Sequence, residues 1–418
     1  MQITYDPDTL AHAGACVVIT IGSTMPRVIK GDWVSAYLKY TEETESPTSY
    51  HTWTAVSMLA GALQRKCSMQ WGLETIYPNM FVILVGSAGR TRKSLAINIG
   101  QDIFKSLDIP VVSEAITPEA LLVKMQNSEG QYIDSQGLCH MHSSLTCFSK
   151  ELVTLLGHSN YKFLGYLTDW WDSHDKWVYE TIARREEAVL GMYLNILGAT
   201  APDWMATMLP TEAIGGGFTS RCIFVAEINK SKHIPLPTVT AEQVKLKQAL
   251  IHDLGLIALI QGNYEFETDA AEVYKQWYLK ESKDMENEKY PIEDPRFRAY
   301  CERRSTHLRK LCIVLQASQD DSLKITTKTW ERSLALLEKT EHLMPNVFGG
   351  LGRSDQGQLT YELIQYIGRK KIVGRETLFK NFYKDMSWST YVEIEDALRN
   401  MNLITVDPKT KTITYTGE

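Results

Sequence analysis

Residues 80–94 have the sequence MFVILVGSAGRTRKS, in which an apolar run changes at Gly86 into a glycine-containing loop. Six consecutive apolar residues, 80–85, are typical of a strand that is buried on both faces, as in the parallel sheets of α/β proteins. The loop ends at Lys93 and Ser94, where a helical pattern begins. A strand, a glycine loop, Lys-Ser and a helix in this order form the context of a phosphate-binding loop, or P-loop.

The chemistry of the loop supports a nucleotide site. Backbone N–H groups around Gly86 and Gly89 would form an anion cradle, to which the helix N-terminus adds positive charge. Lys93 would reach the β- and γ-phosphates of ATP, and the Ser94 hydroxyl would be a ligand of Mg²⁺. The loop departs from the pattern GxxxxGK[ST], because Gly86 to Lys93 is one residue longer and Arg92 replaces the second glycine. A plain glycine turn beside a chance basic pair stays an alternative.

Four further apolar runs predict the other strands of a parallel sheet, and hence an α/β fold with an AAA+-like P-loop core. They are residues 109–112, 144–148, 192–197 and 222–226. Glu151 follows the third strand and is the candidate for polarising the attacking water. The aspartate that usually precedes this residue is absent, because Lys150 stands there, so Ser149 or water would hold the metal shell. A solvated glutamate in a first helical turn is the alternative.

Two more candidates flank the later strands. Thr200 follows the fourth strand and could sense the γ-phosphate, or it could cap a helix that begins near Pro202. Arg221 directly precedes the fifth strand. In a ring it would lie at the subunit edge and could reach the neighbour's γ-phosphate as an arginine finger. A surface arginine near a glycine turn is the alternative there.

Composition and net charge limit the binding partners and the cellular compartment that we expect for this chain. The chain has 418 residues and a net charge of −6, which excludes a broad basic face that coats DNA and leaves only local nucleic-acid contact. No run of eighteen apolar residues exists, so we expect no membrane span. The seven cysteines form no CxxC pair, which favours a reducing cytoplasm over a disulfide framework. At residues 139–142, CHMH, we expect a loop that leads into a strand rather than a metal site.

These motifs allow a resemblance to be named. The order of elements resembles an AAA+ ATPase, and TSRCIFV at residues 219–225 resembles the arginine-finger strand of MCM-type replicative helicases. The strings GSAGRTRKS, FSKEL, LNILGATAP and GGGFTSRCIFV resemble motifs of phage- and mobile-element-encoded ATPases, which often accompany primases and are treated as replicative helicases. The resemblance covers roughly residues 46–345. It implies that Lys93 and Ser94 bind nucleotide, and that Glu151, Thr200 and Arg221 are the catalytic acid, sensor and finger.

An insertion between the third and fourth strands offers a nucleic-acid contact. In ring helicases, insertions at this point line the central pore, where single strands need cations for the backbone and aromatic faces for the bases. Lys176, Trp177, Arg184 and Arg185 supply both. The alternatives are that the two adjacent tryptophans, Trp170 and Trp171, are core anchors and that the Arg-Arg-Glu-Glu sequence is a salt-bridged surface helix.

Linkers and helical patterns divide the rest of the chain. We expect an N-terminal arm at residues 1–45, the ATPase core at 46–230, a helical lid over the nucleotide at 231–348 and a winged helix at 353–418. Basic residues cluster locally in the last segment, at Lys370, Lys371, Arg375, Lys380 and Lys384. A winged helix binds DNA or serves only for protein contact, and both remain open.

The expected function is a ring-forming, DNA-dependent ATPase, with six subunits, that moves along single-stranded DNA as a replicative helicase of a phage or mobile element. Its partners would be DNA, further copies of the chain and a primase or other replication proteins, in the cytoplasm of a bacterial host. Two alternatives remain. One is an ATP-switched initiator or loader that binds duplex DNA. The other is a nucleotide-gated scaffold without turnover, suggested by Lys150.

Overall fold

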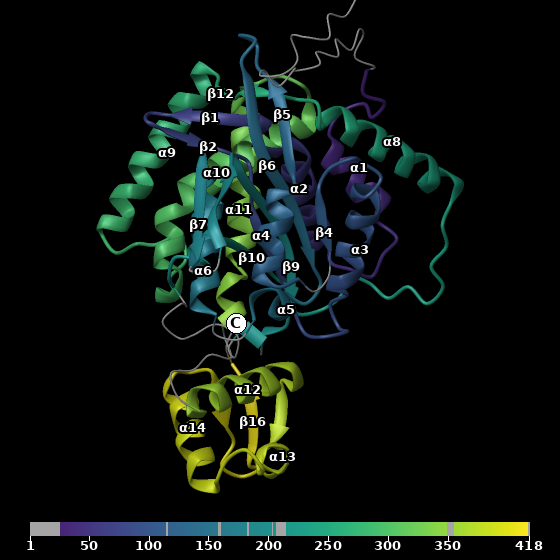
Figure 1. The fold of residues 1–418 in the computed structure, drawn as a ribbon. Helices are drawn as coiled ribbons and strands as arrows, with labels where there is room; N and C mark the ends of the chain where they lie inside the picture. Colours follow the sequence, from purple (N-terminus) through teal and green to yellow (C-terminus); the bar gives the residue numbers. More distant parts are fainter. Residues whose placement is uncertain are drawn as a thin grey trace, which may run out of the picture.

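The computed structural model describes residues 26–113, 116–157, 160–181, 184–202, 204–205, 215–348 and 355–416. Two hydrophobic cores organise these residues. The larger one extends from Trp33 to Phe348, and the smaller one lies between Leu363 and Ile413. The smaller core belongs to the C-terminal unit, which is yellow in Figure 1.

A six-stranded, mainly parallel sheet forms the centre of the larger unit. The strand order is β10 (Cys222–Ala226), β3 (Phe81–Val85), β9 (Met192–Thr200), β6 (Cys139–Ser149) and β4 (Val111–Ser113), with β5 (Glu129–Ile133) beside β6. Only the β5–β6 pair is antiparallel. Every residue of β3, β9 and β10 is buried, as expected for strands that are covered on both faces.

The predicted strands agree with the observed ones in position but differ in length. The run at residues 222–226 matches β10 at both ends, whereas β6 and β9 extend well beyond the predicted runs. The added residues of β6 include Ser143 and Ser149, which are buried polar side chains within the parallel ladder with β9. A pattern of apolar residues misses them, because the ladder satisfies the backbone whatever the side chain is.

Helices cover the sheet. Helix α2 (Thr48–Leu63) packs between the strands β3, β9 and β10 and the helices α1, α8 and α10, and every residue from Trp53 to Leu63 is buried. Helices α3 (Lys93–Phe104), α5 (Leu152–Leu156) and α6 (Tyr161–Asp172) contact β9, and α4 (Pro118–Gln126) contacts β6. This enclosure explains why α2 is apolar on nearly all sides.

The expected N-terminal arm is shorter than residues 1–45. Residues 33–40 form helix α1, whose Trp33, Val34 and Tyr37 are buried in the main core. The indole Nε1 of Trp33 donates to Leu250 O at 3.0 Å. These residues therefore belong to the core, while residues 1–25 lie outside the described part of the chain. Eight residues are too few for a clear helical period, which is why the sequence did not reveal this helix.

The helices of residues 231–348 share the main core instead of forming a core of their own. They are α8 (Ala241–Ile257), α9 (Thr268–Glu286), α10 (Arg298–Gln319) and α11 (Thr327–Glu341). Lys310 of α10 donates to the side-chain oxygen of Asn79, just before β3, at 2.7 Å. His307 hydrogen-bonds Ser220 O, just before β10, at 3.0 Å. Helix α10 therefore lies at the amino ends of the strands, opposite to the glycine loop, and closure of these helices over a nucleotide stays a prediction.

The C-terminal unit contains the three helices and the hairpin that the sequence predicts. They are α12 (Asp355–Lys370), α13 (Arg375–Phe382), α14 (Trp388–Asn400), β15 (Ile404–Val406) and β16 (Thr412–Tyr415). A further strand, β14 (Ile372–Gly374), pairs with β16 and completes an antiparallel sheet in the order β14-β16-β15. Three residues between two helices carry no clear period of their own, so the sequence did not predict this strand.

Short sheets complete the larger unit. They pair β1 (Cys67–Trp71) with β2 (Glu74–Ile76) and β11 (Gly262–Asn263), β12 (Glu265–Phe266) with β13 (Lys324–Ile325), and β7 (Lys176–Thr181) with β8 (Arg184–Leu190). The β7–β8 hairpin is the insertion that precedes β9.

Candidate functional site

The carboxyl ends of the parallel strands bring the predicted residues together. Val85 of β3 pairs with Thr200 of β9 on one side and with Ala226 of β10 on the other. Beyond these pairs, Gly86 N donates to Thr200 O at 3.3 Å, and Glu227 N donates to Val85 O at 3.0 Å. In open α/β sheets, ligands bind in the crevice outside this edge. The sheet therefore presents the glycine loop where a ligand site is expected.

Gly86 cannot carry a side chain in this packing. A Cβ atom at this position would lie 2.5 Å from both the Thr91 hydroxyl and the Tyr50 hydroxyl, and 2.8 Å from Glu227 O. Tyr50 also donates to Val85 O at 2.6 Å, and Thr91 is fully buried. The loop thus turns tightly back against α2, because its first residue has no Cβ.

Arg92 adopts the conformation that glycine normally supplies. Its φ of 55° and ψ of 34° lie in the left-handed region, and it forms the N-cap of α3. Its guanidinium lies 3.0 Å from Glu45, which Lys230 contacts at 2.5 Å. The hydrogen bond from Lys230 is the main reason why the pKa of Glu45 falls to about 2.

The position of the helix also changes how the loop is counted. Helix α3 begins at Lys93. Counted back from Ser94, residues 87–94 have the eight-residue length of GxxxxGK[ST], with Ser87 and Arg92 in the two glycine positions. The extra residue inferred from Gly86 disappears in this alignment, and the departure is then two substitutions instead of an insertion.

Lys93 lies over the loop, next to an acidic group. Its ammonium donates to Gly86 O and, at 3.4 Å, to Ser87 O. Burial lowers the pKa of Lys93, while the nearby Glu151 carboxylate acts in the opposite direction. Glu151 is exposed at the N-terminus of α5 and makes no capping hydrogen bond there. The structure therefore brings Lys93 and Glu151 into one electrostatic neighbourhood, with the exposed Ser94 beside them.

Thr200 and Ser149 are buried at the ends of their strands. Thr200 is 3% exposed, and its hydroxyl donates to Ala201 O at 3.3 Å. Ser149 is 2% exposed and pairs with Gly198 across the ladder. Both side chains are at the edge where the sequence placed them. Their contact with a phosphate or a metal shell stays a prediction.

Arg221 lies at the opposite edge of the sheet. It is buried just before β10, its guanidinium contacts Asp172 at 2.6 Å, and it donates to Gly217 O at 3.0 Å. From Arg221 to Ala226, the last residue of β10, the chain takes five residue steps, which span about 16 Å at ~3.3 Å per residue. Arg221 therefore cannot reach the glycine loop of its own chain, and a catalytic role would require a second copy.

The predicted nucleic-acid residues lie on the β7–β8 hairpin. Lys176 is exposed, whereas Trp177 is buried. The indole of Trp177 packs edge-on against Trp170 at 5.4 Å and Tyr166 at 5.3 Å between centroids. The ring of Trp177 is therefore no open stacking surface, and the adjacent Trp170 and Trp171 are buried, as the core-anchor alternative predicts. The Arg-Arg-Glu-Glu sequence begins strand β8 and does not form the surface helix of the other alternative. The side chains of Arg184 and Arg185 lie outside what the structure describes.

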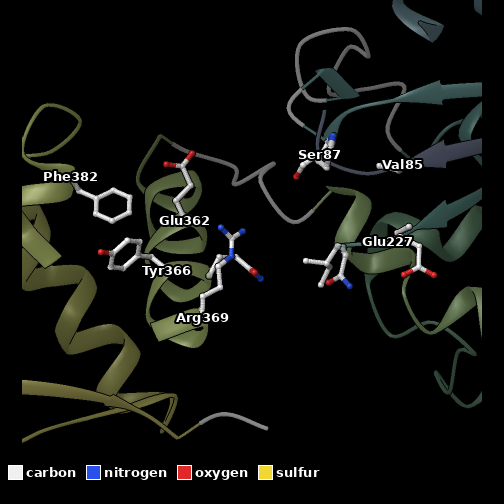
Figure 2. Close-up of a pocket in the computed structure, with 12 residues that line it drawn as sticks. Val85, Ser87, Glu227, Glu362, Tyr366, Arg369 and Phe382 are labelled. Carbon is white, nitrogen blue, oxygen red and sulfur yellow. The ribbon is translucent and has the colours of Figure 1, made fainter. Parts of the chain in front are cut away.

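A cavity of about 400 Å³ adjoins the glycine loop. Figure 2 shows Val85, Ser87 and Glu227 on one side of it, with Glu362, Tyr366, Arg369 and Phe382 of the C-terminal unit on the other. The rings of Tyr366 and Phe382 are 5.7 Å apart. The C-terminal residues could not be assigned to this edge from sequence, because they are far from the glycine loop along the chain.

Sequence reasoning also missed residues that shape the loop. Tyr50, Thr91 and Glu227 surround Gly86, and Ser49 donates to Glu227 at 2.6 Å. Glu227 had one detectable signal, since it is an acid directly after a buried strand. Tyr50 and Thr91 had none.

Residues 139–142 are part of strand β6 and do not form the expected loop. His140 contacts Asp134 at 2.7 Å, and His142 hydrogen-bonds Ser144 at 2.8 Å. Within the described ranges, no group of three or more His, Cys, Asp or Glu side chains is placed to hold a metal ion.

Neither a family model nor a curated protein sequence matches this chain. Over the part of the chain that the structure describes, no helix has the length and apolar character needed to cross a membrane. The geometry of the site must therefore support any conclusion about function.

Proposed function

We propose that this chain binds ATP at residues 86–94 and hydrolyses it. One observation carries the proposal. Lys93, at the start of α3, folds back on the carbonyls of the glycine loop at the carboxyl edge of a parallel sheet, with Glu151 beside it. Phosphate oxygens are natural ligands for an ammonium and a helix N-terminus in this position.

The residues present fit a nucleotide and Mg²⁺. The tight turn at Gly86 and the left-handed Arg92 direct the loop around the start of α3, where backbone N–H groups have no helical partner. Ser94, exposed in the first turn, would hold Mg²⁺ together with the phosphates of the substrate. The metal would supply charge neutralisation on the β- and γ-phosphates. Glu151 would accept the proton of the attacking water.

The wider arrangement supports an oligomeric motor. Numbered along the chain, the five parallel strands have the order 5-1-4-3-2, which is compatible with an AAA+-like core. Arg221 is remote from its own glycine loop, so a ring of copies, six in the proposal, would let it act on a neighbour's nucleotide. The C-terminal unit has the elements of a winged helix, and its basic cluster offers a contact for DNA. We therefore extend the proposal to a replicative helicase that moves on single-stranded DNA.

A scaffold without turnover is the second candidate. Lys150 is half-buried directly before Glu151, where P-loop ATPases usually carry an aspartate. A cation at that position repels Mg²⁺ and weakens the metal shell. ATP binding would survive this change better than hydrolysis.

The test is the rate of ATP hydrolysis with and without single-stranded DNA. We expect Lys93→Ala and Glu151→Gln to lower the rate at least a hundredfold, with Glu151→Gln still binding ATP. Lys105→Ala, at the exposed far end of α3, is the matched control and should keep full activity. Binding of ATP without turnover in the wild type would favour the scaffold. Turnover that survives Lys93→Ala would refute the site.

A further inference from the structure

A second cavity, of about 550 Å³, lies at the amino edge of the sheet, opposite to the glycine loop. The end of α6 contributes Trp171, Asp172 and Ser173 to its lining, and Arg221 comes from the start of β10. Helix α10 supplies Arg303 and Lys310, which are seven residues apart and so share one helical face. None of these groups faces the proposed nucleotide site of the same chain.

Two basic side chains in this cavity have no carboxylate in direct contact, although the charge of Asp172 acts on both from nearby. Among the described residues, Arg303 makes no hydrogen bond or ion pair, although it is half-buried next to Arg221. Lys310 is 3% exposed, and its ammonium donates only to oxygens of Asn79 and Trp171. Burial lowers the pKa of Lys310 to about 7, so the permanent cations of the cavity are the guanidinium groups of Arg221 and Arg303.

The lining also holds unused hydrogen-bond donors. Arg221 Nε, Trp171 Nε1 and Ser173 Oγ are buried and find no partner in the described part of the molecule. Arg221, Trp171 and Ser173 are 7%, 4% and 3% exposed. Two of these groups can only donate, and leaving a buried donor unpaired costs about 1–3 kcal/mol. The missing partner must therefore be an acceptor.

Acidic side chains also line the cavity and bear on which anion it favours. Glu74 and Asp175 are exposed at the edge, and Asp175, at 96% side-chain exposure, contacts Arg65 outside the cavity. Asp172 already holds one side of Arg221. Acidic groups at the entrance repel a long polyanion more than a single small anion that passes between them. A nucleic-acid strand is therefore the less favoured occupant.

We infer that this cavity binds one phosphoryl group of a small ligand, held by Arg221 and Arg303 with Ser173 as an additional donor. Guanidinium groups match the oxygens of a phosphoryl group in charge and in planar geometry. The group could come from free inorganic phosphate or from the terminal phosphate of a nucleotide on a second copy. Only the second source rests on the proposed function.

The first experiment is a calorimetric titration of the full chain with inorganic phosphate and with pyrophosphate, in a Lys93→Ala background. That background removes anion binding at the glycine loop. We expect one saturable site, with affinity lowered about tenfold or more by Arg303→Gln and several-fold by Ser173→Ala. Arg298→Gln is the matched control, because Arg298 is exposed on the same helix and paired with Glu288.

Several results would overturn the inference. One is the absence of saturable binding of both anions, and another is binding that Arg303→Gln leaves unchanged. A third is displacement of phosphate by a single-stranded oligonucleotide with one-to-one stoichiometry, because the ligand of the cavity would then be a nucleic-acid backbone. A fourth is a lower midpoint of thermal unfolding for Arg303→Gln in the absence of ligand, which would show that the Arg303 side chain stabilises the fold. The inference predicts an unchanged or higher midpoint.

The source of the phosphoryl group can be identified by mixing the Lys93→Ala and Arg303→Gln variants and measuring ATP hydrolysis by the mixture. An intact cavity on the first copy can then meet an intact loop on the second. Recovery of turnover above the sum of the separate variants identifies a neighbour's nucleotide, and no recovery identifies a free anion. If the wild type does not hydrolyse ATP, the titration still decides the inference, so the two failures remain distinguishable.

Discussion

Replacing Gly86 by alanine tests how closely the loop is packed. The new Cβ atom would lie 2.5 Å from the hydroxyl oxygens of Tyr50 and Thr91 and 2.8 Å from Glu227 O. Since Glu227 O is a backbone atom, the loop itself must move. Overpacking of this kind costs about 1–3 kcal/mol, so we expect the free energy of unfolding to fall by about 2 kcal/mol in urea titrations. ATP affinity should fall too, because the loop shifts.

Gly89→Ala separates packing from backbone strain. Gly89 has a φ of 67° with no atom near its Cβ position, so alanine there costs only the left-handed conformation, about 1 kcal/mol. Removing the Tyr50 hydroxyl in Gly86→Ala/Tyr50→Phe should recover part of the Gly86 loss, as a coupling of at least 0.5 kcal/mol in a double-mutant cycle. Equal costs for the two glycines, together with zero coupling, would refute the packing described for the loop.

Three further changes test other parts of the molecule. Burial lowers the pKa of His307 to about 3, and the nearby Lys310, Arg303 and Arg221 act in the same direction. Below pH 6.5 the unfolded chain therefore binds a proton that the folded chain does not, so the free energy of unfolding decreases as the pH is lowered. His307→Gln should remove about 1.4 kcal/mol per pH unit of this decrease between pH 6.5 and 5, measured by urea unfolding at each pH. Asp32 caps α1 and binds Arg332 through both oxygens at 2.7 Å, so Asp32→Ala should cost about 2–4 kcal/mol by the same assay, and a cost below 0.5 kcal/mol would contradict the contact. Trp177→Ala should cost about 3–5 kcal/mol if the indole is a core anchor, whereas a loss of DNA-stimulated ATP hydrolysis with unchanged stability would instead support stacking on bases.

Much of the fold could be predicted because its elements have local causes. The buried strands are apolar runs, and Thr117 and Thr240 cap their helices through hydrogen bonds to backbone N–H groups. The strand order could not be predicted. Parallel strands pair through backbone groups that every sequence shares, so nothing local states that β3 lies between β9 and β10.

The candidate site also contains some features that the sequence predicts and others that it does not. Lys93, Ser94 and Glu151 could be located because each follows the end of a strand by a short, fixed distance in the chain. Arg92 stands out in the sequence because it replaces a glycine of the loop pattern, and the structure places it in the left-handed conformation. The partners that fix these residues, such as Tyr50 under Gly86 and Asp172 on Arg221, come from distant segments and leave no pattern. The burial of Trp177 could not be predicted from the sequence either, because it depends on contacts with Trp170 and Tyr166 of α6.

The two cavities, taken together, bear on how the protein assembles. The glycine loop lies at the carboxyl edge of the sheet, and the backbone of Arg221 lies at the amino edge, about 16 Å away along a fully buried strand. No rotation of side chains closes such a distance. If turnover needs Arg221 or Arg303 at the γ-phosphate, a monomer cannot supply them, and the rate per subunit must rise with protein concentration until the copies are associated. A specific rate that stays constant down to concentrations where sedimentation shows only monomers would place all catalytic groups on one chain, and would leave the amino-edge cavity as a site for a free anion.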